Sequence, residues 1–253
     1  MNLKTETKTA LIDLELISYS HAAKAESTGT GLQSLVEMVE FTIQSVVSAC
    51  RAQKHYLVVS GRDNFRKVLY PDYKAGRREK PSLYVPLMDK LEEANASRWC
   101  KHDQLEADDL LGIMLTNGRV KNPILCSIDK DLLGVPGWHY NWNKDDWPRG
   151  VTQAEADFHW LVQLLMGDST DNIEGMKGIG IAKAQKLASA YCEKTGTPLA
   201  PIPAAQKIYE AEGFTLDAYK KCLMLISIWR SPMPAELLEN ELILEVSKTI
   251  PSL

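Results

Sequence analysis

Residues 9–14 read Thr-Ala-Leu-Ile-Asp-Leu, a short apolar run that meets its first acid at Asp13. Similar short runs, rich in branched or aromatic residues, recur at 56–60 and 123–128, and such runs predict buried strands. Residues 32–49, between the first two runs, carry apolar side chains at helical spacing. This alternation predicts an α/β fold with a mostly parallel central sheet flanked by helices.

The second half of the chain has the pattern of a helical region, because strand signals end after about residue 150. Thr152 and Glu155 form a capping-box pattern, which predicts a helix that runs to about Met166. A glycine-rich turn at 175–180 precedes a second predicted helix at 181–191, and prolines interrupt the tail. We therefore predict two domains, residues 1–150 and residues 151–253, of which the second is all-helical.

Length and composition are those of a globular protein: 253 residues, 45% hydrophobic and 25% charged. This balance excludes disordered, collagen-like and disulfide-rich classes. The net charge of −4 excludes nucleic-acid binding by bulk positive charge alone, although a local basic strip is compatible with it. Without a membrane span, a signal peptide or paired Cys-x-x-Cys motifs, we expect a monomer of the reducing cytoplasm that contacts no membrane and needs no small-molecule cofactor.

Acidic residues follow or adjoin the predicted strands at several separate places. Each group alone has an ordinary interpretation, as helix caps or loop residues. Ligand sites of parallel sheets, however, lie beyond the carboxyl ends of the strands, so we expect the acids to converge there. The acids in question are Asp13, Glu106, Asp108, Asp109, Asp129, Asp131, Asp168 and Asp171.

Such a group of acids needs counter-charge. Two unit charges about 4 Å apart repel by about 4 kcal/mol at an effective dielectric constant of about 20. Oxygen ligands without His or Cys indicate Mg²⁺, with Mn²⁺ able to substitute, rather than zinc. Two such ions per site can hydrolyse a phosphodiester, so the acids predict a nuclease.

A basic strip at 62–78 carries six basic and two acidic side chains. A solvated loop is the ordinary interpretation of such a run. The interleaved aromatics Phe65, Tyr70 and Tyr73 favour base stacking beside phosphate contacts instead. The strip therefore supplies candidates for DNA binding, namely Arg66, Tyr70, Tyr73, Lys74, Arg77 and Arg78.

The glycine turn is a second candidate for DNA binding. Glycines let a backbone approach closely, and the N–H groups at the start of the next helix can hold a phosphate. Lysines surround the turn, which favours a clamp on the DNA backbone over a plain helix hairpin. The candidates here are Lys177, Gly178, Gly180, Lys183 and Lys186.

Four short motifs occur in an order that is specific when taken together. They are Tyr73-Lys-Ala-Gly-Arg77, Glu106-Ala-Asp-Asp109, Asp129-Lys-Asp131, and Gly167-Asp-Ser-Thr-Asp-Asn172 followed by Gly178-Ile-Gly180. Over about residues 9–187, the chain resembles the 5' nuclease family of flap endonucleases, DNA polymerase I 5' to 3' exonuclease domains and phage 5' to 3' exonucleases. The resemblance implies a PIN-like nuclease domain joined to a helix-three-turn-helix DNA-binding domain.

The resemblance also implies roles for individual residues. The ligands of a first catalytic metal would be Asp13, Asp63, Glu106 and Asp108, and those of a second would be Asp129, Asp131, Asp168 and Asp171, with Asp109 in support. Lys74 and Arg77 resemble bases that steady the scissile phosphate, and Tyr73 resembles an aromatic that stacks on a terminal base. In this family the glycine turn often holds K⁺ through backbone carbonyls.

Three departures from the family pattern bear on these roles. Ser60 and Gly61 stand where an acid usually follows the second strand, so that Asp63 is the candidate in its place. Ala182 stands where a Lys is common, and Gln163 stands where a base is frequent. We expect catalysis to survive these changes, with weaker substrate binding.

The expected function is a Mg²⁺-dependent 5' nuclease that acts on DNA with 5' ends, flaps or junctions. Two alternatives stay open: a catalytically silent, structure-specific DNA-binding protein, and a ribonuclease with a similar acidic site. RNA/DNA hybrids are a further candidate substrate. The segment 199–253 is expected to be helical scaffold.

Overall fold

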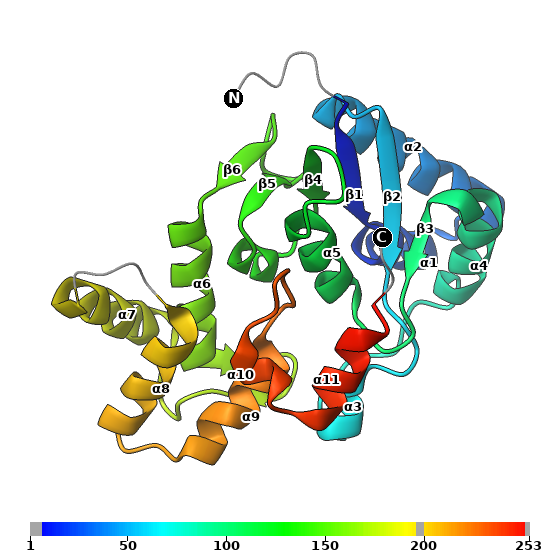
Figure 1. Ribbon diagram of the computed structural model, residues 1–253. Coiled ribbons are helices and arrows are strands. Elements are labelled where there is room, and N and C mark those ends of the chain that lie inside the picture. The colour runs from blue at the N-terminus through cyan, green and yellow to red at the C-terminus, as the bar shows by residue number, and fades with distance from the viewer. Residues whose placement is uncertain (1–6, 196–199, 251–253) are drawn as a thin grey trace.

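The computed structural model describes residues 7–195 and 200–250. Its centre is a six-stranded sheet of order β3-β2-β1-β4-β5-β6 (Figure 1). All neighbouring strands are parallel except β5 and β6, which confirms the predicted mostly parallel sheet. The strands are β1 (Thr9–Asp13), β2 (Lys54–Val59), β3 (Trp99–Lys101), β4 (Pro123–Cys126), β5 (Gly137–Tyr140) and β6 (Arg149–Val151).

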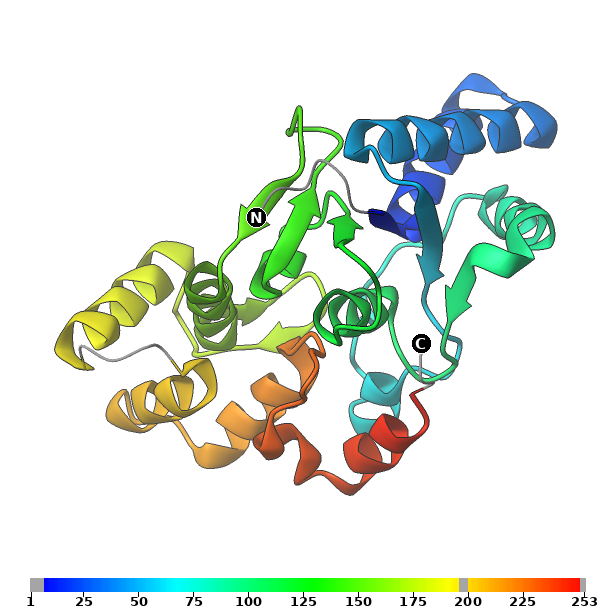
Figure 2. The same cartoon turned by 45° about the horizontal axis from the view of Figure 1, so that its top comes forward.

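Helices cover both faces of this sheet, as the side chains of β1 require. Ala10 and Ile12 belong to the apolar cluster under one helical layer, whereas Leu11 belongs to the cluster under the other. The first layer is α1 (Leu14–Thr28), α2 (Leu32–Cys50) and α4 (Tyr84–Asn95), which a short 3₁₀ turn, η1 (Ala96–Arg98), follows; the second is α5 (Ala107–Thr116). Figure 2 shows the blue helices α1 and α2 on the opposite side of the strands from the green α5.

The second half is built around α6 (Gln153–Met166), which begins at the predicted capping box of Thr152. Packed on α6 are α7 (Ile181–Thr195), α8 (Pro201–Ala211) and α9 (Leu216–Ile226). The chain then turns back through α10 (Ala235–Leu238) and α11 (Glu241–Lys248), and α11 contacts α3 (Phe65–Leu69) (Figure 1). No helix within 7–195 and 200–250 is long and apolar enough to cross a membrane.

The prediction of an all-helical second half is wrong in one detail. A two-stranded sheet, β7 (Gly167–Asp168) and β8 (Ile173–Glu174), follows α6. These strands are too short to give a periodic pattern in the sequence. A Cβ on Gly167 would lie 2.3 Å from the Gly175 nitrogen, so this pairing requires glycine.

One continuous apolar core joins the two halves of the chain. It contains Leu11 and Leu111 from the sheet layers and Leu161 and Trp229 from the helical part. The rings of Phe65 and Trp229 lie 5.0 Å apart. We propose that the two parts meet near residue 150 and pack on this shared core.

Candidate active site

The acid that ends β1 is anchored at the carboxyl edge of the sheet. Asp13 caps α1 by accepting a hydrogen bond from the Leu16 N–H at 3.4 Å. Its other oxygen accepts from the Ser127 hydroxyl at 2.8 Å, and Ser127 directly follows β4. The same hydroxyl oxygen accepts from the Asp129 N–H at 3.1 Å. The ends of β1 and β4 are thereby tied together around two acids.

The neighbouring acids shift one another's pKa values at this edge. Burial raises the pKa of Asp13 to about 7, opposed by the Ser127 hydrogen bond and reinforced by the charges of Glu15 and Asp129. Burial likewise raises the pKa of Asp108, as do the charges of Asp13 and Asp129. The charges of Asp13 and Asp129 therefore act on Asp108, and the charge of Asp129 acts on Asp13, as expected from the sheet topology.

A second acidic group adjoins the first. Burial raises the pKa of Asp131 to about 6, followed by the charges of Asp129, Asp168 and, more weakly, Asp171. Asp129 also accepts a hydrogen bond from the Asp131 N–H at 2.8 Å. Asp168 ends β7 and accepts from the Thr170 N–H at 2.8 Å, so the turn after α6 brings its acids toward the loop after β4.

Basic side chains from the 62–78 strip reach across this acidic edge. Lys74 forms ion pairs with Glu106 and with Asp171, the latter at 3.4 Å. Arg77 donates to Asp171 Oδ1 from Nη2 at 2.6 Å and from Nε at 3.0 Å. Lys74 has a φ of 60°, a left-handed conformation uncommon for residues other than glycine. The acids and the two predicted phosphate-binding bases therefore lie at one site.

Glu106 is the N-cap residue of α5 and is held by three neighbours. Burial opposes its charged form, but Lys74 and Arg66 outweigh burial and lower its pKa. The Tyr73 hydroxyl donates to Glu106 Oε2 at 2.7 Å. Tyr73 is only 4% exposed, so the prediction of an exposed platform for base stacking is wrong. The hydroxyl group of Tyr73 instead fixes the carboxylate of Glu106 by a hydrogen bond.

Arg66 and Phe65 are also buried, which corrects their predicted place in a DNA-binding strip. Asn64 caps α3, and the two residues that follow turn inward, each at most 2% exposed. The guanidinium of Arg66 binds Asp109 and donates to the Leu225 and Ser227 carbonyls at 2.8 and 2.7 Å. It is closed to phosphate, and Asp109 supports the site from the interior.

Asp63 does not join the acids. It is exposed, its N–H donates to the Asp103 carbonyl at 2.8 Å, and it is not among the main causes of the pKa shifts of Asp13, Glu106, Asp108 and Asp131. Glu15 lies beside the end of β2 instead, and no motif in the sequence marks it. Ser60, directly after β2, donates to Glu15 Oε2 at 2.7 Å.

The remaining predicted DNA contacts lie on the surface. Arg78, Lys177, Lys183 and Lys186 are exposed. Gly178 has a φ of 77°, which favours glycine, and Gly180 immediately precedes α7. Tyr70 is partly buried beneath the Lys221 ammonium, 5.3 Å from its ring centre. These groups are accessible to a polyanion, apart from the covered ring of Tyr70.

The donor chemistry of the acidic edge fits divalent cations. All candidate donors are carboxylate oxygens, as Mg²⁺ and Mn²⁺ prefer. The raised pKa values of Asp13 and Asp131 indicate a deficit of positive charge that such an ion would relieve. Within the described part of the chain, no three Asp, Glu, His or Cys side chains already form a cation-binding group; Lys74 and Arg77 pair with Glu106 and Asp171 instead.

Comparison with known proteins identifies relatives of the same kind. The Exonuclease of Escherichia phage T7 is 32% identical over 123 residues, covering 46% of this chain and 41% of the relative. DNA polymerase I of Treponema pallidum (strain Nichols) is 32% identical over 162 residues, covering 56% of this chain and 16% of the relative. The chain thus matches less than half the length of either relative.

Solved structures share the fold. The T5 D15 protein co-crystallized with metal ions superposes with a TM-score of 0.61 at 17% identity, over 95% of this chain and 97% of the other. The bacteriophage T5 D15 flap endonuclease in complex with DNA and metal ions gives a TM-score of 0.59, also at 17% identity, over the same shares of the two chains. The family described as 5'-3' exonuclease, N-terminal resolvase-like domain, matches residues 8–146. Since this match covers more than half of the chain, the protein belongs to the 5'-3' exonuclease family.

Proposed function

We propose that the protein is a divalent-cation-dependent 5' nuclease that hydrolyses DNA phosphodiesters near 5' ends, flaps and single-strand/duplex junctions. The observation that carries this proposal is the gathering of buried and partly buried acids at the carboxyl edge of the sheet, beside Lys74 and Arg77. The phage T7 relative, named an exonuclease, and the T5 flap endonuclease crystallised with DNA add support.

The acids divide into two groups that would hold two Mg²⁺ or Mn²⁺ ions. Asp13, Glu106 and Asp108 would form the first group, and Asp129, Asp131, Asp168 and Asp171 the second. Bound cations of this kind activate water and stabilise the leaving oxygen of a phosphodiester. No side chain is then needed as a covalent nucleophile.

Basic groups of the chain would bind and orient the substrate. A scissile phosphate competes with Glu106 and Asp171 for Lys74 and Arg77, so these bases would move from carboxylate to phosphate when DNA binds. Arg78 and the exposed lysines Lys177, Lys183 and Lys186 would contact the DNA backbone around the turn at Gly178 and Gly180, without reading sequence. We also propose K⁺ at that turn, bound by backbone carbonyls.

A labelled substrate panel tests this function. Purified protein with Mg²⁺ is incubated with a 5' flap, a nicked duplex, a blunt duplex, single-stranded RNA and an RNA/DNA hybrid, with EDTA as control. Mg²⁺-dependent release of 5' DNA products is expected. Cleavage of RNA alone would identify a ribonuclease, and flap binding without cleavage would identify a DNA-binding protein.

The two-cation arrangement has its own test. The double variant Asp129→Asn with Asp131→Asn should abolish cleavage while flap DNA still binds, because it removes negative charge from the second group without removing a base. Full activity in this variant would reject the assignment.

A further inference from the structure

No acid of the cluster directly follows β2, whereas its neighbour β1 ends in Asp13. Ser60 and Gly61 follow β2. A Cβ on Gly61 would lie 2.1 Å from the carbonyl oxygens of His102 and Asp103, so no side chain fits at that position. The nearest acid along the chain, Asp63, is exposed.

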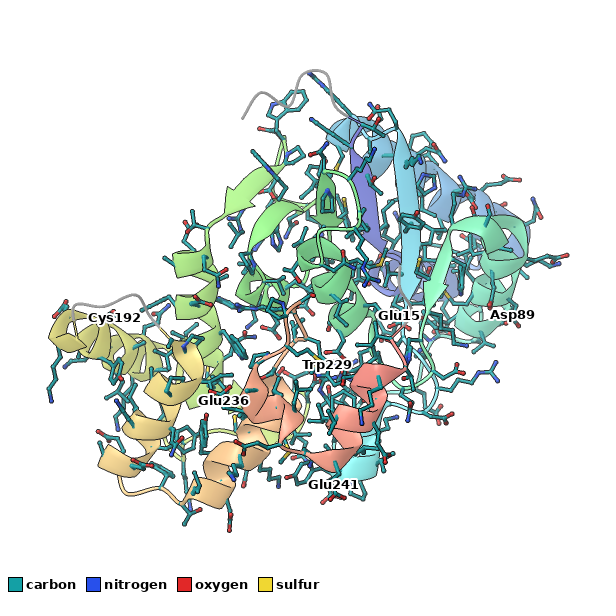
Figure 3. All side chains as sticks on the ribbon, viewed as in Figure 1. Glu15, Asp89, Cys192, Trp229, Glu236 and Glu241 are labelled. Carbon is teal, nitrogen blue, oxygen red and sulfur yellow. The ribbon has the colours of Figure 1, made fainter. Side chains whose placement is uncertain are left out.

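Glu15 approaches this place from α1. Its Oε2 accepts the hydrogen bond from the Ser60 hydroxyl at 2.7 Å, and its Oε1 lies 3.5 Å from the Tyr84 hydroxyl. Tyr84 is only 4% exposed, so the carboxylate lies between a strand end and a buried phenol. Figure 3 shows Glu15 near the tip of β2, whereas Asp89 lies on the α4 side of the molecule.

The same hydrogen-bond chain connects Glu15 to the site. The Ser60 oxygen accepts from the N–H of Ala107 at 3.0 Å. Ala107 lies between Glu106 and Asp108, which belong to the first acidic group. One hydroxyl group therefore links the carboxylate of Glu15 to the backbone at the start of α5, between two acids of that group.

We propose that Glu15 is a cation-binding carboxylate of the first group, in place of the acid that is absent after β2, and that Ser60 positions it. The ligand is a divalent cation, Mg²⁺ or Mn²⁺. This inference rests on the proposed function in so far as the cation serves the nuclease, but cation binding can be measured without DNA.

The test is Mn²⁺ binding to the full chain by titration calorimetry, together with the Mg²⁺ dependence of flap cleavage. Glu15→Gln keeps the size of the side chain and removes its charge. We expect its Mn²⁺ affinity to fall by about tenfold or more, with a parallel rise in the Mg²⁺ concentration for half-maximal cleavage. Asp89→Asn, a matched loss of charge on α4, should bind Mn²⁺ as the wild type does. Wild-type affinity in Glu15→Gln would overturn the proposal.

A relocation experiment tests the position of the carboxylate. In Glu15→Gln with Ser60→Asp, a carboxylate stands directly after β2, and we expect part of the lost Mn²⁺ affinity to return. Ser60→Ala alone should weaken binding less than Glu15→Gln. Failure of the second carboxylate to restore any affinity, in a variant with a wild-type circular dichroism spectrum, would overturn the claim that Glu15 stands in for an acid of β2.

Two further variants keep the outcomes separable. Should Glu15→Gln fold poorly, Glu15→Asp retains the charge and is expected to bind Mn²⁺ with intermediate affinity. A loss of Mn²⁺ affinity in Asp63→Asn, with none in the Glu15 variants, would assign the role to Asp63 and overturn the proposal. A wild-type chain that binds Mn²⁺ through Glu15 but cleaves no DNA would contradict the nuclease function while upholding the cation site.

Discussion

Arg66 and Asp109 form a two-point ion pair inside the protein, with Nη1–Oδ2 at 2.6 Å and Nη2–Oδ1 at 2.8 Å. Asp109 also accepts from the Trp229 N–H at 3.2 Å, and Arg66 donates to the Ser227 carbonyl at 2.7 Å. The pair therefore fastens α5, the helix of the acids, both to α3 and to the segment after α9. Through Arg66 Nη1, 3.3 Å from Glu106 Oε2, it also reaches the site.

Breaking this pair should destabilise the protein strongly. Arg66→Ala leaves a buried carboxylate without its partner, a change that typically costs about 3–5 kcal/mol of the free energy of unfolding. Urea unfolding followed by circular dichroism measures it. Arg77→Ala is the matched control, because Arg77 pairs with Asp171 but has a side chain 55% exposed; we expect a loss of at most about 1 kcal/mol there. Equal losses in the two variants would contradict a structural role for Arg66.

Gly61 should tolerate no side chain. In Gly61→Ala the new Cβ would meet the carbonyl oxygens of His102 and Asp103 at 2.1 Å, so the loop before α5 must shift. We expect a loss of about 1–3 kcal/mol in stability and weaker Mn²⁺ binding. Gly150→Ala is the control, since its Cβ would have open space around it. A Gly61→Ala protein with wild-type stability and Mn²⁺ affinity would show that this contact is not tight.

The sheet and most of its acids could be predicted because they follow from local patterns. Short apolar runs in the sequence predict β1, β2 and β4. Because β1 and β4 are parallel, Asp13 and Asp129, which end or follow them, lie at one edge of the sheet. The edge strands β3 and β6, of three residues each, are too short for such a pattern.

Side-chain direction could not be predicted from composition. Arg66 and Tyr73 belong to a basic, aromatic segment that is typical of DNA-binding loops, yet the Asn64 cap and the contact with Trp229 turn its first part inward. The tail was expected to be scaffold only, and its carbonyls hold Arg66. Glu15 was missed because its partner, Ser60, is 45 residues away along the chain.

The stability of the cation-free protein should fall as pH rises through neutrality. The pKa of Asp13 is raised to about 7 and that of Asp131 to about 6. Between their unfolded values near 4 and these values, the folded state binds more protons than the unfolded state, so stability decreases with pH. Urea unfolding in EDTA at pH 5 and pH 8 measures this contribution as the difference between the wild type and Asp13→Asn.

The variant comparison is needed because buried histidines act in the opposite direction. Burial lowers the pKa of His139 to about 4, and its contribution to stability is lost as pH falls below its unfolded value near 6.5. Relative to the wild type, Asp13→Asn should be more stable at pH 8 than at pH 5. Adding Mg²⁺ at pH 8 should stabilise the wild type more than the variant. An identical pH dependence of the two proteins would show that Asp13 does not carry a raised pKa.

Lys74 should affect the rate of cleavage more than DNA affinity. Its ammonium pairs with Glu106 and Asp171, beside the atoms that would hold the reacting phosphate. Lys74→Met keeps the length of the side chain, and loss of one such charged donor typically lowers kcat by about 100-fold or more. Steady-state cleavage of a 5' flap at saturating substrate measures kcat, with Lys67→Met, an exposed base on α3, as control. A variant with normal kcat and weakened flap binding would make Lys74 a binding residue only.

The lysines of α7 should set the salt dependence of DNA binding. Lys183 and Lys186 are exposed on α7, just after the turn at Gly180. Each phosphate contact contributes about 0.9 to the slope of log affinity against log salt, so Lys183→Ala with Lys186→Ala should reduce that slope by about two. Fluorescence anisotropy of a labelled flap, in the inactive background of Asp129→Asn with Asp131→Asn, measures it without cleavage. Lys207→Ala, an exposed loss of charge on α8, should leave the slope unchanged. If the α7 variant also leaves it unchanged, this helix does not contact the DNA backbone, and the proposed clamp at the glycine turn has to be abandoned even where the acidic site cleaves normally.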